Sequence, residues 1–273
     1  MERENDKAEQ AIMTLAEQEL PVPMEELEAD ANLGGKITFR DIGFPYLYVL
    51  QSMSPQVNPD NSKYIEGAMP GMLFLTNLDR VYDGRNEGLD VVLCHYDRKM
   101  TMWRQREQGG GFHGAYDPND PVVKEAKPNE RGILTLPNGM VLVDTAYHFL
   151  MAYLPDSQSW TQAVMPLKST GMKASRKVSA IIQASTSPSG KPLPRFTWKW
   201  RLTTYKEQKD NYIWSSPRFE RIGMVPKGLY ERGKEFATLA AREDIVRRVV
   251  EAEAGDNEPA NGNGQISDKD VPF

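Results

Sequence analysis

The sequence is poor in the side chains that bind metals and form disulfides, with one cysteine (Cys94) and three histidines among 273 residues. A lone cysteine cannot form a disulfide within the chain, and sparse cysteine suits a reducing compartment. One thiol and three imidazoles supply few soft ligands for a structural zinc site. We therefore expect no metal centre, and no motif in the sequence predicts a cofactor.

Long apolar runs are also missing. Residues 140–154 form the most hydrophobic stretch, but Asp144 and His148 interrupt it, so we expect no membrane-spanning segment. The N-terminus is acidic and has no basic segment followed by an apolar one, so secretion is not indicated. These absences predict a cytoplasmic protein without a membrane partner.

Residue patterns that would support catalysis are weak. Cys94 and His95 are neighbours in an extended segment, so their side chains would point to opposite faces of a strand. The glycine run at residues 109–111 lacks the lysine and Ser/Thr of a phosphate-binding loop. A metal-dependent nuclease needs clustered carboxylates. The available aspartates are scattered along the chain: Asp83, Asp90, Asp97 and Asp144. We predict that the protein is not an enzyme, and a metal-dependent nuclease is kept as a weaker alternative.

The net charge of -5 hides a basic body between acidic ends. Residues 1–30 carry ten acidic and two basic side chains, and residues 251–273 carry six acidic and one basic. Between these ends, residues 168–234 carry fifteen basic and four acidic side chains. This asymmetry favours a polyanionic partner, with an ordinary solvated surface as the alternative.

Short β-rich segments separated by turn residues fill most of residues 36–219. The single strands expected there are residues 72–76, 89–96 and 99–105. Two hairpins are also predicted, one joining residues 140–154 to 160–168 and one joining residues 195–205 to 211–219. Many short strands with irregular turns favour an antiparallel barrel or sandwich. We therefore expect a fold that is mainly β with helical additions (α+β).

Helical periodicity predicts three helices. Residues 3–20 have the pattern of an acidic amphipathic helix. A second helix is capped by Ser169 or Thr170 and runs to about Ala184. The third covers residues 233–254, where an apolar stripe predicts packing on the barrel rather than binding to a partner.

The composition changes after Ala254. Residues 255–264 have no large apolar side chain, so they cannot bury enough surface to offset chain entropy and are expected to be disordered. We therefore divide the chain into an acidic arm (residues 1–30), a folded domain (residues 31–254) and an acidic tail (residues 255–273).

The most specific motif is the tip of that tail, Asp268-Lys269-Asp270-Val271-Pro272-Phe273. A phenyl ring can fill a small apolar pocket while acidic groups pair with basic residues on its rim. The motif resembles the C-terminal tip of bacterial single-stranded DNA-binding proteins, in which aspartates precede Ile-Pro-Phe. Here Val271 replaces the isoleucine and Lys269 interrupts the aspartates. The resemblance implies that the tip binds replication and recombination proteins through Asp268, Asp270, Val271, Pro272 and Phe273.

The body does not align with the bacterial family, but it is similar to phage single-stranded DNA-binding proteins. The similar segments are Leu167-Lys168-Ser169-Thr170 with the following Lys173, Arg176 and Lys177, and Arg201-Leu202-Thr203-Thr204. This resemblance implies an OB-like antiparallel β-barrel core that acts in DNA replication, recombination or repair in the bacterial host cytoplasm. It also implies that the acidic tail competes with DNA and recruits partner enzymes.

Sequence-independent binding of single strands needs cations that follow phosphates and aromatic rings on which bases stack. In residues 195–202 the aromatic side chains alternate with basic ones, and we expect the aromatic face to be core. Trp103 lies on the polar face of its strand, where either a base or a loop of the protein would cover it. The predicted DNA-binding residues are Arg98, Lys99, Trp103, Arg104, Arg106, Lys173, Arg176, Lys177, Lys199, Arg201, Tyr205, Tyr212 and Trp214.

A second hypothesis is a protein–protein adaptor or inhibitor, which would present the tip to host enzymes and would not bind DNA.

Overall fold

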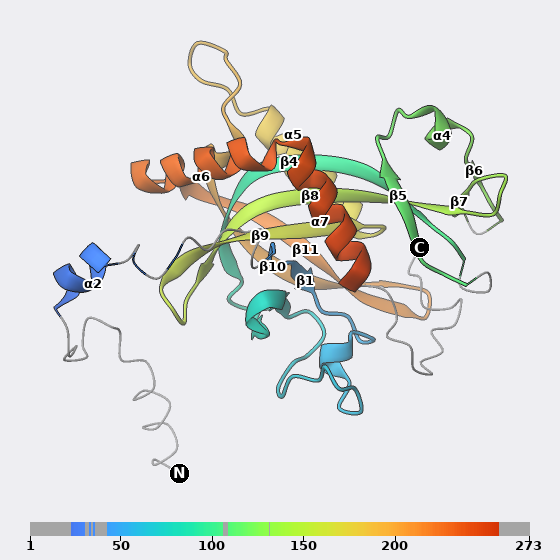
Figure 1. Ribbon diagram of the computed structural model, residues 1–273, viewed down its shortest axis with the longest axis horizontal. Helices are drawn as coiled ribbons and strands as arrows, with labels where there is room; N and C mark the ends of the chain where they lie inside the picture. The colour runs from blue at the N-terminus through green and yellow to red at the C-terminus, as the bar shows by residue number, and fades with distance from the viewer. Residues whose placement is uncertain are drawn as a thin grey trace.

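The protein is mainly β with helical additions, as the sequence predicts, and the computed structural model describes residues 23–30, 33, 35, 43–105, 109–130 and 132–256 (Figure 1). The predicted helix at residues 3–20, and the acidic tail beyond residue 256, lie outside the described residues. In chain order the elements are α2 (Met24–Asp30), β1 (Leu47–Val49), η1 (Pro55–Val57), β2 (Leu73–Leu75), η2 (Thr76–Leu78), β3 (Arg80–Tyr82), β4 (Leu89–Trp103), β5 (Phe112–Tyr116), α4 (Pro121–Lys124), β6 (Lys127–Pro128), β7 (Leu134–Thr135), β8 (Val141–Leu154), β9 (Ser159–Lys168), α5 (Gly171–Gln183), η4 (Arg195–Thr197), β10 (Trp198–Lys209), β11 (Tyr212–Met224), α6 (Lys227–Ala240) and α7 (Glu243–Asp256).

Long antiparallel strands form the centre of the main sheet. β4 pairs with β8 and β8 pairs with β9, which gives a three-strand meander. After α5, β10 returns to pair with the start of β4, and β11 pairs with β10. Both predicted hairpins are confirmed, because β8 and β9 are joined by residues 155–158 and β10 and β11 by residues 210–211.

β4 is one continuous strand, although the sequence suggested two strands at residues 89–96 and 99–105. A register shift between Leu93 and His95 bends β4 instead of ending it. The first residues of β4 pair with β10 and the last ones with β5, so one edge of the strand serves two partners. This bend accompanies the curling of the sheet into a half-barrel (Figure 1).

The small sheet of β1, β2 and β3 lies between β9 and β11. Tyr46, just before β1, forms a parallel bridge with Val164 of β9. On the other side, the side-chain amide of Gln51 accepts from the backbone N–H of Ser215 and donates to its carbonyl, each at 2.9 Å. Because an amide side chain here takes the place of a strand backbone, Gln51 links β11 to the segment that follows β1.

The inner face of the half-barrel forms the main core. Trp200 and Leu202 of β10 are fully buried there with Leu93 and Leu150, and α5 packs over them with its buried face. The prediction that the aromatic face of residues 195–202 is core is therefore confirmed for β10. Phe196 packs against the second core, under the C-terminal helices, because the η4 turn precedes the strand and directs this ring against Tyr230 of α6.

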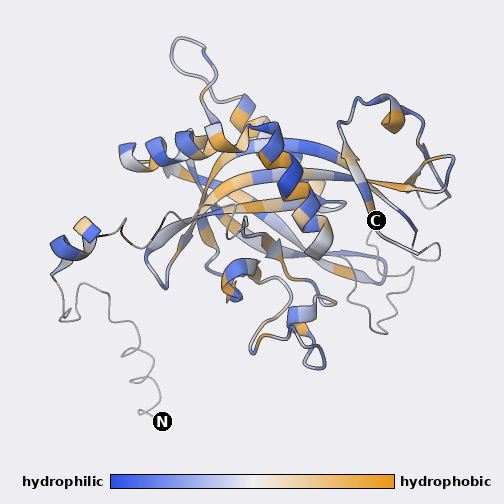
Figure 2. Cartoon of the chain, viewed as in Figure 1, coloured by the Kyte–Doolittle hydropathy of each residue, from blue (hydrophilic) through white to orange (hydrophobic). Residues whose placement is uncertain are grey.

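The C-terminal helices cover the opposite face of β4, β8 and β9 (Figure 1). Their apolar sides face the sheet and their polar sides face outward, as the hydropathy colouring shows (Figure 2). The sequence predicted one helix over residues 233–254, but the helix breaks at residues 241–242 into α6 and α7. Glu253 of α7 is buried under this cover, where it pairs with Lys168 at 2.6 Å and accepts from the Tyr147 hydroxyl at 3.1 Å.

In the described part of the chain, no helix combines the length and the apolarity that a bilayer crossing requires.

Candidate nucleic-acid interface

The β10–β11 hairpin and α5 bring three of the predicted site residues to one carboxylate. Lys173 of α5 donates to Glu207 at 2.9 Å, and the hydroxyl of Tyr205 donates to the same oxygen at 3.1 Å. The indole N–H of Trp214 donates to the other oxygen at 3.1 Å, and so does the hydroxyl of Ser216 at 2.6 Å. Residues far apart in the sequence thus form one polar cluster, which we call the Glu207 cluster.

Glu207 stays ionised over the whole physiological pH range. The hydrogen bond from Ser216, followed by that from Lys173, lowers the pKa of Glu207 to about 2. The carboxylate neutralises Lys173 in part, but it also orients Tyr205 and Trp214 from two strands.

A further cation, Arg218, lies over the Tyr205 ring at 4.6 Å from its centroid. It is exposed, and it sits two residues beyond Ser216, which pairs with Tyr205 across the hairpin. Arg218 is not among the residues predicted from the sequence, although its alternation with Trp214 and Ser216 in an extended segment placed it on their face.

The tip of the hairpin presents apolar and basic side chains to solvent. Tyr212 is 59% exposed and Ile213 is 60% exposed, which is unusual for large apolar side chains. Lys206 and Lys209 are exposed on the same hairpin. The tip therefore combines an open aromatic face with two nearby cations.

The solvent side of α5 carries Arg176 and Lys177, both exposed. The opposite side buries Met172, Ser175 and Val178 against the barrel, so the helix has one buried and one basic face. Lys173 completes the basic face and reaches the Glu207 cluster.

The basic residues of β4 have acidic partners. Arg98 donates to both carboxylate oxygens of Asp144, at 2.8 and 2.6 Å. Lys99 lies 2.6 Å from Asp117 and 3.6 Å from Asp97. Their charges are offset locally, so these residues add less to an anion-binding surface than the basic face of α5 does.

The basic face of β10 is offset in the same way. Lys199 lies 3.1 Å from Asp90 and Arg201 lies 2.8 Å from it. Arg201 also donates to the carbonyl of Glu87 at 2.7 Å. Asp90 stands opposite Arg201 in the pairing of β4 with β10, so only the strand register reveals this contact.

Trp103 is half-buried at the end of β4. Phe112 meets it edge to face at 5.4 Å, and Lys168 lies 5.9 Å from the ring centroid. Its indole N–H donates to Thr101 at 3.0 Å. Protein groups thus cover part of the Trp103 ring, which was predicted to stack on a base.

The remaining predicted residues make no contact that defines a site in the described part of the chain. Arg104 is exposed beyond the end of β4. Arg106 and the tip residues Asp268, Asp270, Val271, Pro272 and Phe273 lie outside the described residues.

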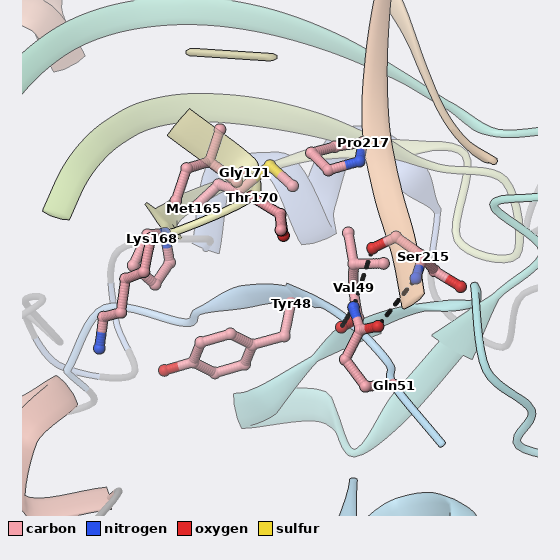
Figure 3. Close-up of a pocket in the computed structure, with 11 residues that line it drawn as sticks. Tyr48, Val49, Gln51, Met165, Lys168, Thr170, Gly171, Ser215 and Pro217 are labelled. Atoms are coloured by element: carbon pink, nitrogen blue, oxygen red, sulfur yellow. Dashed lines mark hydrogen bonds between the residues drawn. The ribbon is translucent and has the colours of Figure 1, made fainter. Parts of the chain in front are cut away.

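A hollow of about 130 Å³ opens between β1, β9, β11 and the first turn of α5 (Figure 3). The Tyr48 ring lies along one side of it, and Thr170 faces that ring from the other side. Gln51 and Ser215, joined by their two hydrogen bonds, form a third wall. The hollow thus lies beside the β11 segment that contributes Trp214 and Ser216 to the Glu207 cluster.

Among the described residues, no group of three or more histidine, cysteine or acidic side chains is arranged to hold a metal ion.

Comparison with known proteins gives one family. A family model described as Pam3 phage gp34-like protein matches residues 13–245. No curated protein and no solved structure matches the chain significantly.

Proposed function

The chain belongs to the Pam3 phage gp34-like protein family, and we propose that it is a sequence-independent single-stranded DNA-binding protein in phage DNA replication, recombination or repair. The observation that carries the proposal is the β10–β11 hairpin, where aromatic and basic side chains lie together in the open. Tyr212 supplies an exposed ring opposite Lys209, Lys206 is exposed on the same hairpin, and Arg218 lies over the Tyr205 ring farther along it. Such surfaces bind unpaired strands by stacking on bases and attracting phosphates, without reading the sequence.

The strand connectivity supports an OB-like interpretation of the barrel. OB-folds are five-stranded, partly open Greek-key barrels that bind oligonucleotides through strands two and three and the loops after strands one and four. Here the meander of β4, β8 and β9, followed by α5 and the β10–β11 hairpin that returns to β4, supplies five strands in a corresponding order. In this assignment the β10–β11 turn is the loop after strand four.

The outer face of strands two and three is not open in this chain, because α6 and α7 cover it. We therefore place the polynucleotide on the β10–β11 hairpin and the adjoining basic face of α5. Lys173 joins the two elements at the Glu207 cluster, so a strand could pass from one to the other along a continuous surface.

The acidic segment Asp268–Phe273 has two roles in this proposal, and both are inferred from its sequence. Its aspartates would compete with DNA for the basic surface, and its Val-Pro-Phe residues would recruit replication and recombination proteins when DNA displaces them. A chain without residues 257–273 should then bind DNA more tightly at low salt.

Tryptophan fluorescence on addition of poly(dT) tests this function. Binding next to Trp214 should quench its emission, and the Trp214→Phe variant should lose most of that change while still binding. An adaptor that does not touch DNA would show no quenching and no shift of a labelled oligonucleotide. The same titration with the chain lacking residues 257–273 tests the competition, which unchanged or weaker binding would contradict.

A further inference from the structure

The hollow beside β11 has the size of one small aromatic ring. Its volume of about 130 Å³ compares with the roughly 150 Å³ of an apolar protein cavity that takes up benzene. A six-membered ring therefore fits, whereas a fused bicyclic ring would protrude from it.

The lining combines apolar and polar walls, and the polar part is the larger. Tyr48, Val49, Met165 and Pro217 supply apolar surface, and the Tyr48 ring lies along one side (Figure 3). Thr170, which forms no side-chain capping bond to α5, directs its hydroxyl toward the hollow. A planar ligand that is apolar on its faces and forms hydrogen bonds at its edge matches these walls, and a nucleobase has this chemistry.

The hollow borders the proposed DNA surface at the edge strand β11. Ser215, on its wall, is the chain neighbour of Trp214 and Ser216, whose side chains point to the other face of the strand. Thr170 lies one turn of α5 before Lys173, which binds Glu207. A strand bound on the Glu207 face therefore reaches the opening by passing around the edge of β11 beside the first turn of α5.

We infer that this hollow receives one base of the bound single strand and that its size selects a pyrimidine over a purine. The inference rests on the proposed function and names a subsite of the same surface. It predicts a preference larger than the modest pyrimidine bias of an open stacking surface such as Tyr212, and one that is lost when the hollow is filled.

The test compares the binding of wild-type protein to oligonucleotides of thymidine, of adenosine and of abasic sites of one length. Wild-type protein should bind the thymidine oligomer at least about fivefold more tightly than the adenosine oligomer, the lower end of what stacking one base contributes. The Thr170→Phe variant fills the hollow and should bind the two oligomers about equally, close to the wild-type affinity for adenosine. The Thr238→Phe variant makes the same exchange on the exposed side of α6, outside the proposed DNA surface, and should keep the preference.

The wild-type comparison keeps the test valid even where Thr170→Phe fails to fold. Equal affinity of the wild-type protein for thymidine and adenosine oligomers overturns the inference and leaves the proposed function intact. Failure to bind any of the oligomers overturns the proposed function, and the subsite with it.

Discussion

Replacing Lys206 and Lys209 by glutamate and Tyr212 by alanine is expected to weaken single-stranded DNA binding by about a hundredfold or more, because one stacked base alone contributes roughly 1–3 kcal/mol. The variant also reverses two exposed charges at the hairpin tip, so nearby phosphates are repelled instead of attracted. Fluorescence anisotropy of a labelled thymidine oligomer measures the loss. The salt dependence should weaken as well, since each phosphate contact on a single strand contributes a slope of about -0.7.

A control with the same two charge reversals separates local contact from net charge. Lys227 and Lys234 are exposed on α6, away from the β10–β11 hairpin, and their replacement by glutamate alters the total charge equally. This control should bind within a few-fold of the wild-type protein. All of the altered side chains are exposed, so unfolding should be unaffected in both variants. If both variants lose affinity equally, the hairpin is not the binding surface.

Trp200→Ala is expected to lower the free energy of unfolding by about 3–5 kcal/mol, the usual effect of emptying a fully buried aromatic site. Trp200 has no exposed surface and packs between the strands of the half-barrel and α5. Urea unfolding followed by circular dichroism measures the loss. The variant tests whether the inner face of β10 holds the barrel together.

Trp200→Phe is the matched control. Within the described residues the indole N–H of Trp200 has no hydrogen-bond partner, so phenylalanine removes volume without breaking a polar contact. Its effect should be clearly smaller than that of alanine. A Trp200→Ala protein as stable as wild type would show that this ring is not part of the core.

The alternation of side chains was sufficient to predict the core face of β10. Trp198, Trp200 and Leu202 lie on one face because successive residues of a strand point to opposite sides. Phe196 follows the same alternation in the sequence but not in the structure, because the short η4 turn comes before the strand begins. The face predicted for Phe196 was wrong because the alternating pattern does not show where the strand begins.

The split of the C-terminal helix was also present in the sequence. The apolar stripe of α6 ends at Ala240, and that of α7 begins at Ile245, out of phase with a single 3.6-residue repeat. One continuous helix could not have kept both stripes against the curved sheet.

The neutralisation of the basic strands could not be predicted from the sequence. Arg201 and Lys199 meet Asp90 only because β10 pairs with β4 in one register, and Arg98 meets Asp144 through the pairing of β4 with β8. Strand pairing between distant segments follows from the whole barrel rather than from local pattern. The strands with the densest basic sequence are therefore less available to phosphates than the hairpin tip and α5.

Binding of a labelled thymidine oligomer, measured from about 20 to 300 mM NaCl, tests most directly whether the β10–β11 hairpin and the basic face of α5 bind single-stranded DNA. We expect tight binding at low salt and a linear fall of log K with log salt, because each phosphate contact releases counterions. A protein that leaves the oligomer free at the lowest salt, or an affinity that does not change with salt, would contradict the account.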